Sequence, residues 1–133
     1  MKRFVIFLSI GMVFVSGFVF AQDATGSGPD ENDPALYAVG ALGASNLYTT
    51  YFLLGTLADG YATAAYTAVF ADELARDIIG LNETSIEVLQ RMLDETVVNQ
   101  GDRALVQDMI TAHELLIQQT WGLLAYVNDP ADT

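Results

Sequence analysis

The sequence predicts an all-α protein, a small left-handed helical bundle of three or four helices that follows a secretory signal peptide. Apolar residues recur every three or four positions through most of residues 34–127, which is the period of helices that pack together. No segment alternates apolar and polar residues, as a half-buried strand would. Once an apolar leader is set aside, roughly half of the remaining residues are apolar, which is ordinary for one globular domain.

The leader is residues 1–21, predicted to be a cleaved signal peptide. Lys2 and Arg3 precede an apolar run, and Val19-Phe20-Ala21 suits a cleavage site. We therefore expect an exported protein, periplasmic or extracellular. The alternative is an uncleaved anchor, because about 18 apolar residues barely span a bilayer. No later apolar run reaches that length, so we expect no stable membrane insertion after cleavage.

The charge of the chain after cleavage restricts its partners. It has 17 acidic residues and three arginines, and hence a net charge of −14. Such a chain repels nucleic acid and anionic lipid, whereas basic proteins, cationic ligands and divalent cations are compatible with it. The absence of cysteine excludes a disulfide scaffold, a cysteine-based zinc site and a cysteine nucleophile.

The first helix is predicted to follow an acidic tail. Residues 22–33 carry no large apolar side chain and are expected to be disordered. Asp33 suits the N-cap and Pro34 the first helical position. One heptad ladder then continues without a slip through Leu36, Gly40, Gly43, Leu47, Thr50, Leu54, Leu57, Tyr61, Ala64, Ala68, Ala71, Ala75 and Ile78. This favours one helix over 34–79, and the alternative is a reversal at Gly60 that makes two helices.

A second helix is predicted over residues 85–100. Gly80 suits a C-cap, and Thr84 with Glu87 forms a capping-box pattern. The amphipathic pattern of Ile86, Leu89, Leu93 and Val97 follows.

The last helix is predicted over residues 103–127, after a corner at Gly101-Asp102. The domain then covers residues 34–128, and a C-terminal tail covers residues 129–133. The inward ladder of the last helix is Val106, Met109, His113, Leu116, Thr120, Leu123 and Val127.

Two groups of side chains are candidate functional residues. Tyr48, Phe52, Tyr66 and Phe70 form a second stripe along the first predicted helix, which either packs against a second neighbour or is an exposed surface for a homodimer, a protein partner or a ligand. His113 is the one histidine of the chain, and we interpret it as a hydrogen-bonded core residue with a tyrosine hydroxyl as a suitable partner. The alternative is an interior polar site of His113, Tyr51, Tyr61 and Thr120.

The function expected from these residues is association. No nucleotide-binding or catalytic motif occurs, and Ile117 stands where a zinc-protease motif needs its second histidine. We therefore expect no cofactor and no metal. The favoured hypothesis is an exported non-enzymatic helical protein that self-associates or binds a partner or small ligand. The alternatives are an acidic protein that binds cations or cationic ligands and an enzyme that uses His113 with interior tyrosines.

Overall fold

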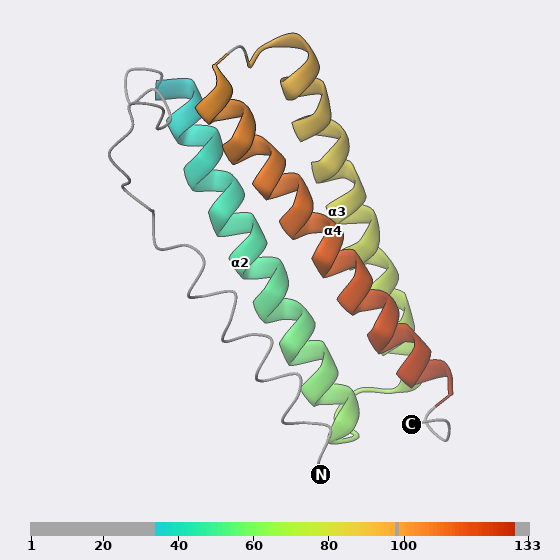
Figure 1. The fold of residues 1–133 in the computed structure, drawn as a ribbon. Coiled ribbons are helices and arrows are strands. Elements are labelled where there is room, and N and C mark those ends of the chain that lie inside the picture. Colours follow the sequence, from blue (N-terminus) through green and yellow to red (C-terminus); the bar gives the residue numbers. More distant parts are fainter. Residues whose placement is uncertain (1–33, 98, 130–133) are drawn as a thin grey trace.

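The computed structural model describes residues 34–97 and 99–129, and these residues form three helices (Figure 1). They are α2 (Pro34–Ala62), α3 (Ala68–Glu95) and α4 (Gln100–Asn128). The chain runs along α2, returns along α3 and reverses again into α4, so α2 and α4 are roughly parallel. The described residues contain no strand, which confirms the all-α bundle. The predicted signal peptide and both predicted tails, except for Asp129, lie outside the described residues.

The inward faces of α2 and α4 are those that the heptad spacing predicts. Every α4 ladder position from Val106 to Val127 is buried, His113 included. On α2 the ladder from Leu36 to Tyr61 is buried or half-buried. Periodicity therefore identifies the core-facing side of both helices.

The predicted continuous helix over 34–79 is wrong. α2 ends at Ala62, and the chain reverses through residues 63–67 before Thr67 caps α3 by accepting a hydrogen bond from the Phe70 amide at 3.2 Å. Within the reversal Ala64 has a φ of 57°, and the Gly60 carbonyl accepts hydrogen bonds from the backbone amides of Ala65 and Tyr66. The alternative, two helices with a break close to Gly60, is therefore correct. Gly60 itself still belongs to α2.

The predicted corner at Gly80 and Thr84 is also wrong, because α3 runs through both residues. The hydroxyls of Thr84 and Ser85 donate to the carbonyls of Gly80 and Leu81, each at 2.9 Å. They bond back to the preceding turn of the same helix, so neither residue caps a new helix. The predicted helix over 85–100 is the C-terminal part of α3, which ends at Glu95.

The corner between the last two helices is confirmed, a few residues before its expected place. It lies between Glu95, the last residue of α3, and Asn99, which is the N-cap of α4 because its side chain accepts from the Gly101 amide at 2.8 Å. From α4, the Arg103 guanidinium donates to the carbonyls of Leu93 (2.7 Å) and Val97 (2.9 Å). A cation at these carbonyls stabilises the C-terminus of α3.

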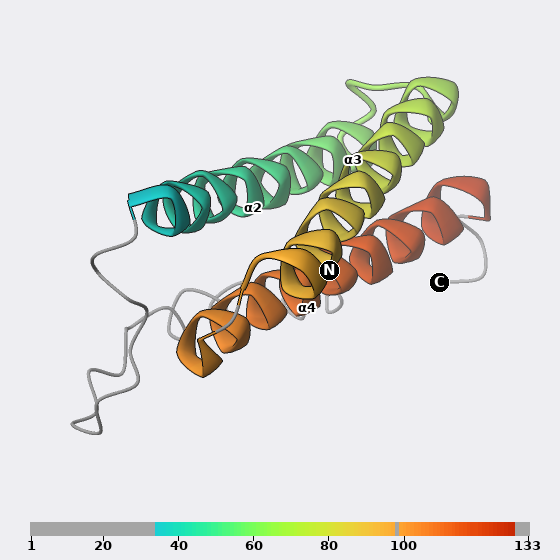
Figure 2. The same ribbon diagram turned by 90° about the horizontal axis from the view of Figure 1, so that it is seen from above.

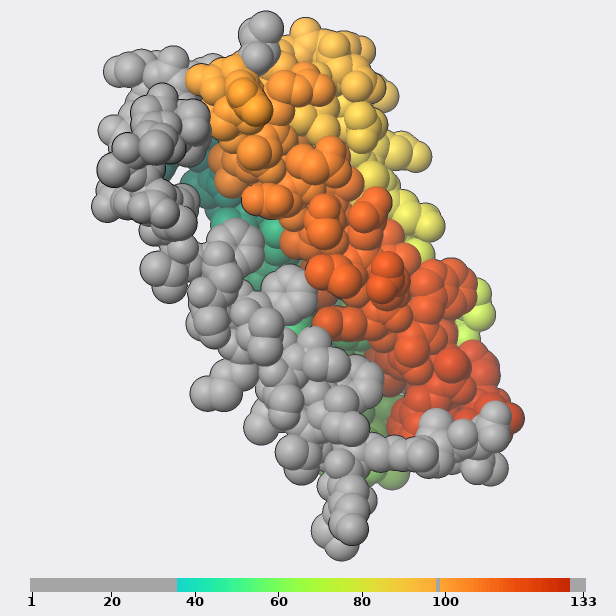
Figure 3. Space-filling view, in the orientation of Figure 1, coloured from blue at the N-terminus to red at the C-terminus, as the bar shows by residue number. Residues whose placement is uncertain are grey.

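α3 and α4 pack closely along their length, whereas α2 contacts both of them less extensively. Figure 2 shows α2 to one side of the α3–α4 pair, and Figure 3 shows side chains of α4 lying against those of α3 along the visible face. α2 approaches α4 at Gly43, where any Cβ would meet the Met109 side chain. The end of the Met109 side chain thus packs over Gly43, and a larger residue there would displace it.

Gly60→Ala is expected to lower the free energy of unfolding by about 1–2 kcal/mol. The ring of Tyr66 lies over Gly60, so an added methyl group would displace it, and overpacking of this kind costs about 1–3 kcal/mol. The helix-propensity gain of up to about 1 kcal/mol offsets only part of this. Urea denaturation followed by circular dichroism measures the change.

Gly80→Ala is the matched control. Apart from its chain neighbours and the backbone of its own helix, no atom lies within 4 Å of a Cβ added at Gly80, which stands in the interior of α3. The substitution should therefore stabilise the protein by up to about 1 kcal/mol. A loss of stability at Gly80 would mean that α3 is interrupted there.

Candidate functional site

A buried hydrogen bond between α3 and α4 is the first candidate. The Oδ1 atom of Asn82 lies 2.7 Å from Nδ1 of His113, and the two residues are 0% and 1% exposed. The Asn82 amide nitrogen donates to the Ile78 carbonyl at 2.7 Å, and that carbonyl can only accept. Oδ1 of Asn82 therefore faces the ring, and Nδ1 of His113 carries the proton. In the neutral ring the lone pair is on Nε2.

A second set of polar contacts lies one turn further along α3, and we call the two sets together the polar layer: Asn46, Thr50, Asn82, Ser85 and His113. Asn46 on α2 donates to the Ser85 hydroxyl on α3 at 3.4 Å and accepts from Thr50 at 3.4 Å. An apolar cluster with Leu57 and Ile78 lies on one side of the layer, and a cluster with Val106 and Met109 lies on the other. A third, smaller cluster of Leu47, Ala112 and Leu116 comes between these two along α2 and α4, beside the polar layer.

The predicted interior polar site is not assembled as a unit in the structure. The predicted interior polar site contained two tyrosines, and the structure does not place them with His113. Tyr51 is 38% exposed, which corrects its expected interior position. The hydroxyl of Tyr61 donates to the Val127 carbonyl at 3.3 Å, and that of Thr120 donates to the Leu116 carbonyl at 2.7 Å. His113 is hydrogen-bonded in the core, as expected, but to an asparagine instead of a tyrosine.

Asn82 is the residue that sequence reasoning missed. Its spacing from Ala75, Ile78 and Leu89 puts it on the buried face of α3, and this is visible only when α3 is one helix. Asn82 also begins an Asn-Glu-Thr glycosylation sequon. Its side chain is fully buried and hydrogen-bonded, so it is inaccessible in the folded protein.

Burial lowers the pKa of His113 below its usual value, because a low-dielectric interior disfavours the charged ring. The ring is therefore neutral at pH 7. This fits the hydrogen bond to Asn82, which needs only the proton on Nδ1.

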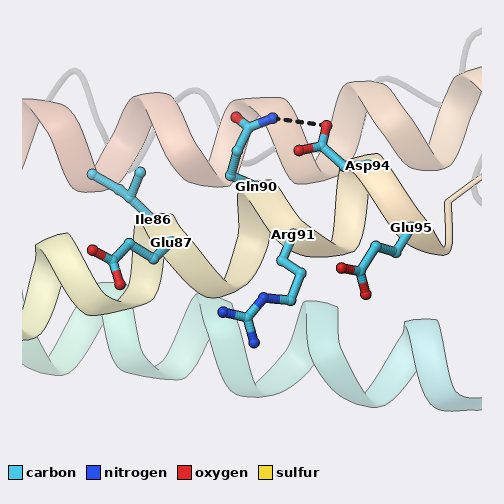
Figure 4. A pocket seen from close by; sticks show the side chains of 6 residues that line it. All are labelled: Ile86, Glu87, Gln90, Arg91, Asp94 and Glu95. Carbon is cyan, nitrogen blue, oxygen red and sulfur yellow. Dashed lines mark hydrogen bonds between the residues drawn. The ribbon is translucent and has the colours of Figure 1, made fainter.

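A shallow depression lies on the surface of α3 (Figure 4). The side chains around it all come from this one helix and are Ile86, Glu87, Gln90, Arg91, Asp94 and Glu95. Gln90 donates to Asp94 at 3.2 Å, and the other carboxylates extend separately along the helix. Within the described residues no three His, Cys, Asp or Glu side chains are grouped so that they could hold a metal ion.

Exposed aromatic side chains are the second candidate. Tyr48 (70% exposed) and Phe52 (65%) lie on α2, whereas Tyr66 and Phe70 lie at the reversal and the start of α3, with ring centroids 5.0 Å apart. All four are exposed, but the reversal after Ala62 divides the predicted stripe into two patches.

The patch on α2 extends along the whole helix. Its exposed residues recur every three or four positions opposite the core-facing ladder, and we call them the outer face of α2: Tyr37, Ala41, Ala44, Tyr48, Phe52, Gly55 and Asp59. Asp59 is the one charged residue of α2. None of the three described helices is long and apolar enough to span a membrane.

Comparisons with protein-family models, with curated proteins and with solved structures found no match. A function must therefore be argued from this chain's own residues.

The energetic role of the buried pair is tested by Asn82→Leu, His113→Leu and the double variant. Each single substitution leaves one buried polar atom without its partner and should cost about 1–3 kcal/mol. The double variant removes both groups, so it should cost less than the sum by about 0.5–3 kcal/mol. Urea denaturation of the four proteins gives this coupling energy.

Asn82→Leu combined with Thr120→Val is the control cycle. Thr120 bonds within its own helix, two turns beyond His113, and shares no partner with Asn82. The effects of these two substitutions on the free energy of unfolding should therefore add. Additivity in the Asn82–His113 cycle as well would contradict the assigned hydrogen bond.

Stability should fall as the pH is lowered from 7 to 5. The unfolded chain protonates its histidine near pH 6.5, whereas burial keeps the folded ring neutral to lower pH. The unfolded state therefore binds more protons in this window, and the free energy of unfolding decreases by at most about 1.4 kcal/mol per pH unit. The Asn82→Leu/His113→Leu variant should lack this component. If the free energy of unfolding changes equally with pH in the wild type and in this variant, the contribution assigned to His113 is wrong.

Proposed function

We propose that this chain is an exported, non-enzymatic protein that acts by association through the outer face of α2. The observation that carries the proposal is the exposure of large aromatic side chains on a helix with one charge. Tyr37 is 76% exposed, and Tyr48 and Phe52 are exposed to a similar extent. Contiguous apolar surface of this kind on a soluble protein marks an interaction site. Aromatic residues are enriched and charged residues depleted at the centres of protein interfaces.

Export is proposed from the sequence of residues 1–21, which has the charged start, apolar run and small-residue end of a signal peptide. The chain contains no cysteine, so oxidising surroundings would leave it without disulfides. Its folding would then depend on the apolar clusters and the polar layer.

The non-enzymatic half of the proposal is supported by the surroundings of His113. The ring is 1% exposed, and its Nδ1 proton is committed to Asn82. A general base must come within hydrogen-bond reach of its substrate, and a ring enclosed by packed helices does not.

The proposal is tested by sedimentation of the tagged protein in the exported fraction of its host. The wild type should sediment as a species larger than a monomer. Tyr48→Glu with Phe52→Glu should give a folded monomer, because carboxylates cannot be buried unpaired at an interface. Circular dichroism checks that the variant remains helical.

Trp121→Glu is the control, since Trp121 is another large aromatic side chain, 51% exposed on α4. It should leave the wild-type complex intact. A wild-type monomer in the extract, or a complex that survives the double substitution, contradicts association through α2. Recovery of intact residues 1–133 in the membrane fraction contradicts export.

A further inference from the structure

The distribution of charge over the molecule restricts what can bind the outer face of α2. α3 alone carries seven acidic residues, and the chain after residue 21 has a net charge of −14, yet α2 carries only Asp59. Two copies that met through α3 would bring many carboxylates together. Two copies that met through α2 would not, so this is the face at which a strongly acidic chain can approach itself.

Other occupants fit this face less well. A basic partner is attracted to carboxylates, and these lie mainly on α3. A helix that lies on a lipid surface is rich in Lys and Arg on its polar side, and α2 contains neither. The occupant that the charge pattern favours is therefore a second copy of this chain.

On the outer face of α2, residues at equal distances on either side of its centre complement each other in size or in hydrogen bonding. Tyr48 is the midpoint of Pro34–Ala62. Four residues to either side of it stand Phe52 and Ala44, a large side chain and a small one. Seven residues away stand Gly55 and Ala41, both small. Eleven residues away stand Asp59 and Tyr37, an acceptor and a phenolic donor.

We propose that α2 packs antiparallel against α2 of a second copy, with the two-fold axis at Tyr48. This deepens the proposed function and rests on it. In this register Phe52 of one copy lies over Ala44 of the other, and the small residues Ala41 and Gly55 let the backbones approach. The hydroxyl of Tyr37 faces the carboxylate of Asp59, so the single charge of the face receives a hydrogen bond.

The area available is sufficient for a reversible dimer. An aromatic side chain buries roughly 150–250 Å². Tyr37, Tyr48 and Phe52 are about two-thirds to three-quarters exposed, so with their small neighbours they supply on the order of 600 Å² per copy. Specific interfaces begin at roughly 1,200 Å² in total. We therefore expect a dimer that dissociates on dilution and that strengthens with added salt, because salt screens the repulsion between the two acidic copies.

Cross-linking of single cysteines tests the register. The chain has no cysteine, so Tyr48→Cys introduces a unique thiol on the proposed axis. A short bis-maleimide should join two copies of the purified exported Tyr48→Cys protein, with a yield at least tenfold above that of Gln118→Cys, an exposed control on α4.

Ala41→Cys and Gly55→Cys determine the direction of the two helices. In the antiparallel pair, residue 41 of one copy is opposite residue 55 of the other and about 21 Å from its own counterpart. A mixture of the two variants should cross-link, and neither variant alone should do so. In a parallel pair each variant would cross-link with itself, and this outcome would overturn the proposal.

If the purified protein is a monomer at high salt, the proposed dimer is wrong. This holds whichever molecule or segment covers the outer face of α2 in the host. If the host extract still shows a complex that Tyr48→Glu with Phe52→Glu abolishes, the proposed function stands and only the identity of the partner is wrong. If neither experiment detects association, both proposals fail.

Discussion

The hydrogen bond between Asn82 and His113 fixes how α3 and α4 align. Both groups are fully buried, so a shift of one helix along the other would leave an amide oxygen and a ring N–H without partners, at a cost of about 1–3 kcal/mol each. Apolar packing is more tolerant of such a shift, because apolar side chains can exchange one set of contacts for another without leaving a polar group unpaired. The polar pair therefore selects one alignment, and this alignment sets the composition of the apolar cluster on either side of it.

α2 is attached to this pair by weaker constraints. Its link to the polar layer is the 3.4 Å contact between Asn46 and Ser85, and it meets α4 at Gly43, over which the end of the Met109 side chain packs. One face of α2 completes the core, and the opposite face, with Tyr48 at its centre, remains exposed. When only one of a helix's two apolar faces is covered, covering the other removes further apolar area from water, and this lowers the free energy. The three described helices thus leave one apolar face of α2 exposed, and this is the face of the proposed association.

Periodicity predicted the buried faces because burial repeats with the helix itself. It did not locate the reversal, since Ala71 and Ala75 continue the α2 heptad register although they belong to the next helix. No glycine marks the left-handed residue, which is Ala64. At Thr84 the sequence predicts a helix start where none exists. The capping pattern lies inside α3, and the buried face of α3 continues before and after Thr84. Asn82 then fell in a predicted loop, so the partner of His113 could not be found without the true course of α3.

Solubility alone does not explain where the acidic residues lie. If the negative charge served only to keep the chain in solution, carboxylates would suit the exposed positions of α2 as well as those of α3. Tyr37, Tyr48 and Phe52 are among the most exposed apolar side chains of the described helices, yet α2 has no charge before Asp59, close to its end. An aromatic surface is a liability for a free monomer, whereas a long-range negative field opposes unspecific clustering of the same molecules. A face with a single charge on a strongly acidic molecule therefore favours close approach in one orientation over the others.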